Sequence, residues 1–186
     1  MTNKSGATHN WISITIYKWA LVLGVFCFQL AVCSGGAAAQ NTLGGHVGVV
    51  FPLVTHADGD TTSIADHFVI GMPVGVTVKG TGRLAVDFEI VPTVQNSPRS
   101  VNLRVDPGLL VKLGRGYTYG TRFAFDINSS QFGFVPLLNR SWPIKSDHSF
   151  FKAYFVEADF PILFNRPPGG EATNPFTFAV HFGVGF

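Results

Sequence analysis

Residues 101–113 read VNLRVDPGLLVKL, and this stretch decides the fold because its side chains change character at every second position. The odd-numbered positions from Val101 to Leu113 are all apolar. The even-numbered positions include Asn102, Arg104, Asp106, Gly108 and Lys112. Successive side chains of a β-strand point to opposite faces, so the stretch predicts a strand with one apolar face and one polar face.

The same alternation recurs along most of the chain after Gln40, where no stretch carries apolar residues at helical spacing for three turns. Only 13% of the 186 residues are charged and 46% are hydrophobic, a balance that excludes a disordered polyelectrolyte. We therefore predict an all-β chain. Its eight expected strands cover about 43–52, 67–79, 83–92, 100–113, 117–128, 131–142, 149–163 and 175–186.

The expected links between these strands differ in length. Residues 80–82, 114–116 and 145–148 are glycine-rich or polar and predict tight turns after the second, fourth and sixth strands. Longer links are expected at residues 53–66, 93–99 and 165–174, whereas Ser129-Ser130 is a short link on the same side. Apart from that short link, the lengths alternate, as expected for an antiparallel barrel with turns at one end and loops at the other.

The N-terminal segment has the organisation of a secretory signal peptide. Residues 19–32 read WALVLGVFCFQLAV, follow Lys18, and precede a small-residue run that contains Ala37 and Ala39. We expect cleavage before Gln40, so that residues 1–39 are removed and residues 40–186 form the barrel domain. A retained anchor helix is the alternative interpretation, and lipid attachment at Cys33 is a second one.

Loss of this segment also sets the charge and cysteine content of the mature chain. Without Lys4 and Lys18, the 13 basic residues fall to the number of the 11 acidic ones, so we expect no nucleic-acid partner. Both cysteines, Cys27 and Cys33, lie in the segment, which leaves neither a disulfide nor a thiolate metal site.

The size of the side chains on each face favours a transmembrane barrel. The apolar faces are large and aromatic, whereas the opposite faces mix small residues with charges of both signs, as a narrow polar lumen requires. We predict that the lumen is plugged by a charge network of Arg83, Asp87, Glu89, Arg104, Asp106, Lys112, Arg122, Asp126, Glu157 and Asp159. The alternative is a soluble periplasmic or secreted barrel that binds an apolar small ligand inside.

Three prolines oppose a continuous barrel. Pro73, Pro107 and Pro136 fall inside predicted strands, and each removes one ladder donor. We expect bulges or local openings at these positions.

The C-terminal residues 176–186 follow the pattern F-x-F-x-x-x-F-G-x-G-F, and residues 157–164 read EADFPILF. These motifs resemble the last two strands of small Gram-negative outer-membrane β-barrel proteins of the OmpA/OmpX-like and porin-family type. The resemblance implies an eight-stranded antiparallel up-and-down transmembrane barrel in the outer membrane, with both termini in the periplasm and long loops outside. It also implies that Phe182 and Phe186 belong to a signal read by the outer-membrane assembly machinery.

Few residues suggest chemistry. The adjacent pair His148-Ser149 falls on a predicted periplasmic turn, so we expect no enzyme, no cofactor and no metal site. The pair Asp58 and Asp60 has the spacing of calcium ligands, but the remaining ligands of a calcium loop are missing, and we interpret it as a solvated loop.

Two histidines are expected to be neighbours, because closure of the barrel pairs the first strand with the last. His46 and His181 both face the lumen at similar distances from the periplasmic end. They form either a pH-sensitive or weakly metal-binding pair, or two separate hydrogen bonds to interior carboxylates.

Aromatic residues gather near the ends of strands on the short-turn side, where an interfacial girdle belongs. They are Tyr117, Tyr119, Trp142, Tyr154 and Phe186.

Overall fold

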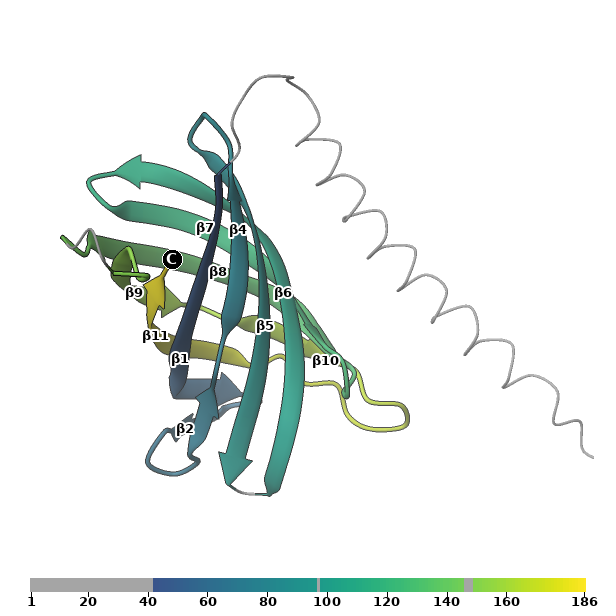
Figure 1. Cartoon of the computed structure of the whole chain (residues 1–186). Helices are drawn as coiled ribbons and strands as arrows, with labels where there is room; N and C mark the ends of the chain where they lie inside the picture. The colour runs from purple at the N-terminus through teal and green to yellow at the C-terminus, as the bar shows by residue number, and fades with distance from the viewer. Residues whose placement is uncertain (1–41, 97, 146–148) are drawn as a thin grey trace, which may run out of the picture. The chain divides into compact units, whose positions relative to one another are not determined.

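The computed structural model describes residues 42–96, 98–145 and 149–186, and its strands form a single antiparallel sheet (Figure 1). The predicted signal peptide, residues 1–39, lies outside the described residues. The strands are β1 (Thr42–Ala57), β2 (Asp60–Ser63), β3 (Val69–Gly71), β4 (Val74–Lys79), β5 (Leu84–Asn96), β6 (Arg99–Gly114), β7 (Tyr117–Asp126), β8 (Gln131–Pro143), β9 (Ala153–Asp159), β10 (Ile162–Asn165) and β11 (Phe176–Gly185).

These segments form a closed barrel of eight strands, and we call each of the eight a stave, because some are made of two segments. β3 and β4 form one stave interrupted at Met72-Pro73, β9 and β10 form another interrupted at Phe160-Pro161, and β2 folds back on the end of β1. β1 also pairs with β11, from His46 opposite Gly185 to His56 opposite Phe176. The first and last staves therefore close the ring, and the predicted all-β, eight-stranded antiparallel fold is confirmed.

Two of the three prolines are accommodated because their carbonyl groups still accept backbone hydrogen bonds. Pro73 O accepts from Gly48 N at 3.0 Å, and Pro136 O accepts from Phe160 N at 2.9 Å. At Pro107 the β6–β7 ladder skips from Val105 to Gly108. Each proline thus removes a donor and interrupts pairing locally without opening the barrel.

Several of the predicted links differ from the structure. The expected long link at 93–99 is wrong, because β5 and β6 continue toward the loop end until Asn96 pairs with Arg99. The expected loop at 53–66 is partly a β-hairpin that turns at Asp58-Gly59. The strands continue through these polar residues, because strand pairing satisfies the backbone hydrogen bonds outside the apolar stretch as well.

On the opposite side, two predicted turns are confirmed and one is longer than expected. β4 and β5 are joined by residues 80–83, and β6 and β7 by Gly114-Arg115-Gly116, in which both glycines have positive φ values of 95° and 81°. β8 ends at Pro143 and β9 begins at Ala153, so the sixth link exceeds the predicted 145–148; residues 146–148 are not described.

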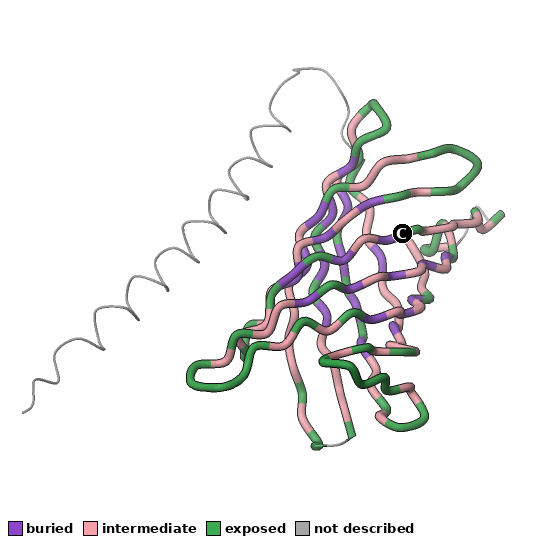
Figure 2. The backbone as a smooth tube through the Cα atoms, turned by 180° about the vertical axis from the view of Figure 1, so that it is seen from behind, coloured by how far each residue is buried: buried purple, intermediate pink, exposed green. Residues whose placement is uncertain are grey.

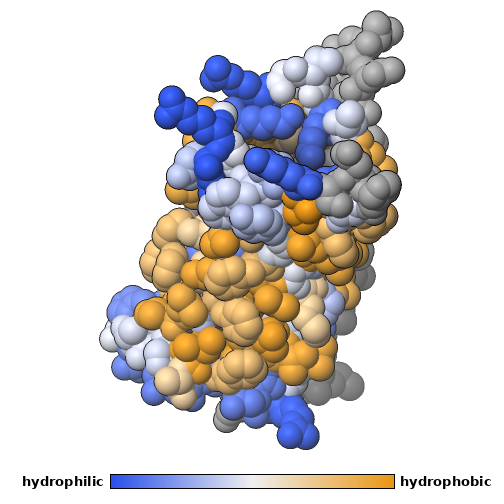
Figure 3. All heavy atoms as spheres, turned by 60° about the vertical axis from the view of Figure 1, so that its left-hand side comes forward, coloured by the Kyte–Doolittle hydropathy of each residue, from blue (hydrophilic) through white to orange (hydrophobic). Residues whose placement is uncertain are grey.

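The two faces of the wall have opposite character. Buried and more exposed residues alternate along the strands (Figure 2), and the buried set includes charged side chains such as Asp87, Arg122 and Glu157. Large apolar side chains stay exposed on the other face, including Phe88, Leu109, Phe134, Ile162 and Phe182. Figure 3 shows such residues as a band between hydrophilic ends.

In the part of the chain described, no helix is long and apolar enough to cross a bilayer.

Candidate functional site: the charged lumen

Arg122 is the centre of the lumen. It points inward from β7 and is only 3% exposed. Its Nε donates to Asp87 Oδ2 at 2.8 Å, its Nη1 donates to Glu157 Oε1 at 2.7 Å, and its Nη2 lies 3.4 Å from Glu89 Oε2. Because Asp87 and Glu89 lie on β5 and Glu157 lies on β9, one guanidinium group ties together three staves that are not neighbours.

Gly108 of β6 lies opposite Arg122 in the register, where β7 approaches closely. A Cβ atom at position 108 would lie 2.7 Å from both Arg122 Cγ and the backbone oxygen of Thr121, closer than real Cβ contacts allow. Gly108 therefore lets β7, including the first carbons of the Arg122 side chain, pack closely against β6. This is a packing reason for a glycine inside a long strand.

Two neutral side chains complete the hydrogen bonds of the acids. Thr77 Oγ1 donates to Asp87 Oδ1 at 2.6 Å, and Asn139 Nδ2 donates to Glu157 Oε2 at 2.9 Å. Thr77 and Asn139 were not predicted as site residues. Alternation along β4 and β8 predicts that both side chains face inward, but it does not predict the register that brings them to these acids.

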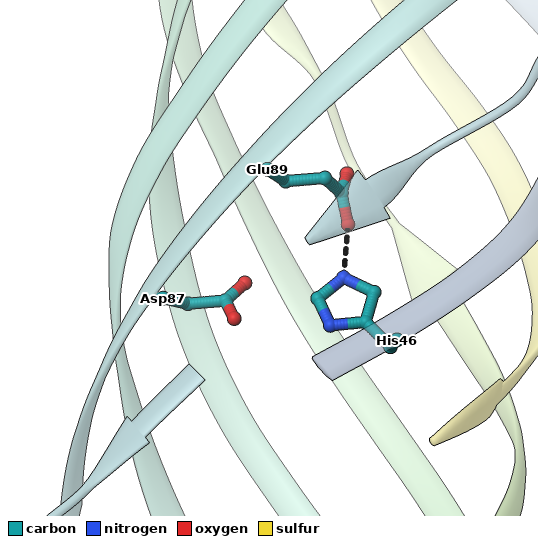
Figure 4. A group of neighbouring side chains, drawn as sticks. All are labelled: His46, Asp87 and Glu89. Carbon is teal, nitrogen blue, oxygen red and sulfur yellow. Dashed lines mark hydrogen bonds and ion pairs between the residues drawn. The ribbon is translucent and has the colours of Figure 1, made fainter. Parts of the chain in front are cut away.

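The two lumenal histidines lie side by side, as expected, with ring centroids 6.3 Å apart. His46 Nε2 is 2.7 Å from Glu89 Oε2, a contact visible in Figure 4, and His181 Nδ1 is 3.3 Å from Glu157 Oε1. This arrangement matches the second interpretation, in which each histidine bonds an interior carboxylate. The pH-sensitive role of the pair stays a prediction.

The remaining residues of the predicted network divide into two groups. Arg104 Nε donates to Asp106 Oδ2 at 3.0 Å, and Asp126 lies opposite Arg104 in the β6–β7 register. Asp159 is buried, but its Oδ1 has no hydrogen-bond partner. Arg83 is exposed in a turn and takes no part in the charge network. Lys112 is half-buried and forms no ion pair with any residue in the described ranges.

Two cavities lie in the lumen and share no lining residue. The cavity toward the loop end has a volume of about 300 Å³ and is lined by residues that include Arg104, Asp126 and Asp159. The cavity toward the turn end has a volume of about 180 Å³ and is lined by residues that include His46 and Arg122. Glu89, Asp106 and His181 line neither cavity, so the charged cluster fills the lumen between them.

The C-terminal phenylalanines lie on the outer face. Phe182 and Phe186 are 45% and 41% exposed. The backbone of Phe186 exchanges two hydrogen bonds with Gly45, each 2.9 Å long, so the last residue is held at the seam of the barrel. Its ring stacks on Phe150 at 4.9 Å.

Comparison with known proteins gives matches in structure alone. No protein-family model and no curated protein matches the chain. The outer membrane protein OprG from Pseudomonas aeruginosa is similar in structure, with 13% identity and a TM-score of 0.41, covering 80% of this chain and 96% of that one. A de novo designed transmembrane β-barrel is also similar, with 12% identity and a TM-score of 0.38, covering 76% of this chain and 95% of the design.

Proposed function

We propose that the protein is an integral outer-membrane β-barrel with a plugged lumen. Its role is structural or is exercised through the loops at the end of the barrel where the longer links lie. The observation that carries this proposal is the inverted polarity of the wall. Large apolar side chains cover the outside of a closed ring of strands, whereas the buried inner face holds Arg122 and its carboxylate partners. A soluble protein rarely exposes so large an apolar surface, whereas a bilayer favours it.

The rim of the barrel at the turn end supports the same placement. Trp142 and Tyr154 stack at 5.3 Å on neighbouring strands, and the guanidinium group of Arg140 lies 4.4 Å from the centre of the Tyr117 ring. Amphipathic aromatic rings beside a cation suit the boundary between hydrocarbon and headgroups. Of the aromatic residues predicted to form a girdle, Tyr117, Tyr119, Trp142 and Tyr154 lie on β7, β8 and β9, whereas Phe186 follows β11.

The alternative function, a soluble barrel around an apolar ligand, requires an apolar interior. The two cavities of this lumen are separated by Arg122 and its carboxylates, so an apolar ligand in either cavity would lie against charged side chains. The inner face thus favours the membrane barrel over the ligand carrier.

We also propose that the barrel does not conduct ions at rest and is not an enzyme. Arg122 contacts carboxylates on β5 and β9, so the charged plug is anchored on staves around the ring. Within the described ranges, no serine hydroxyl is hydrogen-bonded to a histidine ring. His148 of the pair His148-Ser149 lies outside the described residues.

Export and assembly complete the proposal. The predicted signal peptide directs the chain across the inner membrane, and the terminal strand with Phe182 and Phe186 is recognised by the assembly machinery. Exposure of both rings on the outer face makes them available to such a partner.

Cell fractionation tests the proposal, followed by gel electrophoresis of the outer-membrane fraction with and without boiling. We expect a band in the outer membrane whose mobility shifts on heating, because a hydrogen-bonded closed barrel resists detergent until heated. Recovery as a soluble periplasmic monomer would overturn the membrane assignment and favour the ligand carrier.

A further inference from the structure

Asp159 is a buried acid of the lumen that forms no ion pair within the described ranges. It is 5% exposed, points inward from the end of β9, and its Oδ1 accepts no hydrogen bond. Arg122 bonds Asp87 and Glu157, and Arg104 bonds Asp106, so both lumenal guanidinium groups are engaged with other acids. A buried carboxylate without a cation beside it is costly, and a bound cation is one way to offset that cost.

Two further ligand groups converge on Asp159. Glu157 lies two residues earlier on the same face of β9, and His181 lies directly opposite Glu157 in the β9–β11 register. One ligand atom from each of the three residues lies within 4.8 Å of the others, and all three residues are buried. An imidazole nitrogen with two carboxylate oxygens is a donor set that suits Zn²⁺, Mn²⁺, Fe²⁺ or Co²⁺.

The distance between His181 and Glu157 fits two ligands of one ion. His181 Nδ1 and Glu157 Oε1 are 3.3 Å apart, and two donors bound to one ion are at most about 4.2 Å apart, twice a metal–ligand bond of roughly 2.1 Å. The donor atoms of the whole group lie within 4.8 Å of one another, so binding of an ion would draw them closer together.

The second group with metal-like spacing, His46, Asp87 and Glu89, is already neutralised (Figure 4). His46 is 2.7 Å from Glu89, and Arg122 contacts both acids of this group. Arg122 also contacts Glu157 at 2.7 Å, so this contact alone does not separate the two groups. They differ in Asp159, which Arg122 does not contact, and in two buried atoms without a hydrogen-bond partner, Asp159 Oδ1 and His181 Nε2.

Access to that group is from the loop end. Asp159 lines the cavity of about 300 Å³, together with neutral polar residues such as Thr93, Gln131 and Thr177. This cavity has room for the water molecules that would fill the remaining coordination positions.

We propose that Glu157, Asp159 and His181 form a lumenal binding site for one divalent transition-metal ion, entered from the loop end. The site uses inner-face residues alone, so it does not depend on the membrane role proposed above. From the sequence, His181 was considered as a weak metal ligand only in a pair with His46. His181 lies on a different strand from the two acids, and the pairing of β9 with β11 brings it beside them.

The test is metal binding by the full-length product, purified from the fraction in which it accumulates and treated with a chelator. Co²⁺ is followed by its visible absorption and Zn²⁺ by calorimetry. We expect saturable binding of one ion per chain. In Asp159→Asn and in His181→Gln we expect the affinity to fall at least about tenfold, and His181→Gln should also change the Co²⁺ spectrum, because it removes the nitrogen ligand.

Asp126→Asn is the matched control, since it makes the same change in the same cavity at a residue outside the group. Binding is expected to be unchanged in this variant and in His67→Gln, which removes the imidazole that lines the cavity near the loops. The heat-dependent gel shift verifies that each variant is folded.

Three results would overturn the proposal. The first is the absence of saturable binding by the wild type. The second is unchanged affinity in folded Asp159→Asn or His181→Gln protein. The third is an equal loss in Asp126→Asn or His67→Gln, which would place the ion at the cavity wall. If one test variant fails to fold, the other still decides.

Discussion

Arginine substitution at Val105 tests the orientation of the wall most directly. Val105 lies on the outer face near the middle of β6, opposite Ile90 on one side and Phe125 on the other. It is six residues from Arg99 and nine from Gly114 in a strand of 16 residues. At about 3.3 Å per residue and a tilt of roughly 40°, these ends lie about 15 and 23 Å away along the barrel axis. Val105 is therefore placed near the centre of an apolar band about 25 Å tall.

We expect Val105→Arg to cost about 2–4 kcal/mol of folding free energy in a bilayer, because the charge would lie near the midplane. Leu113→Arg is the matched control on the same face of the same strand. Leu113 is 55% exposed and next to the turn at Gly114, where the cost near an interface falls to about 0–1 kcal/mol. The cost depends on depth, so the pair measures the position of the membrane.

The assay is urea unfolding of the protein in lipid vesicles, followed by tryptophan fluorescence and by the heat-dependent gel shift. Equal costs at the two positions, or a cost near zero at Val105, would refute the reasoning. A cost near zero at Val105 would mean that the apolar faces of β5, β6 and β7 do not contact lipid, and equal large costs would mean that Leu113 does not lie near an interface.

Three further changes test the lumen in the same unfolding assay. Arg122→Met is expected to destabilise the barrel by roughly 3–5 kcal/mol, because it leaves buried carboxylates unpaired. An unchanged midpoint of urea unfolding would contradict a stabilising charge network in the lumen. Gly108→Ala is expected to cost about 1–3 kcal/mol, since its Cβ would meet the Arg122 side chain and the backbone oxygen of Thr121. Gly82→Ala, with nothing within 4 Å, is the neutral control, and similar costs for the two variants would contradict the packing reason. The His46→Gln/His181→Gln double variant is expected to lose any pH dependence of stability that the wild type shows between about pH 5 and 8; an identical profile would assign that dependence to other groups.

The sequence by itself determined the strands and their faces. The parity of residues 101–113, repeated in most of the later strands, follows from the two-residue period of a strand, which is a local property of the backbone. It therefore identified Asp87, Arg122 and Glu157 as inward-facing before any pairing was known. The turn at Gly114-Arg115-Gly116 was equally local, because glycines that adopt positive φ mark it.

The tertiary structure alone decided which inward residues meet. Side-chain contacts across the lumen depend on the register of every stave and on the closure of β1 against β11, which no local pattern specifies. For this reason the expected network included Arg83, which lies in an exposed turn, and missed Asn139, which bonds Glu157. The place of His181 beside Glu157 and Asp159 likewise depends on the register of β11 against β9, which the sequence pattern does not specify.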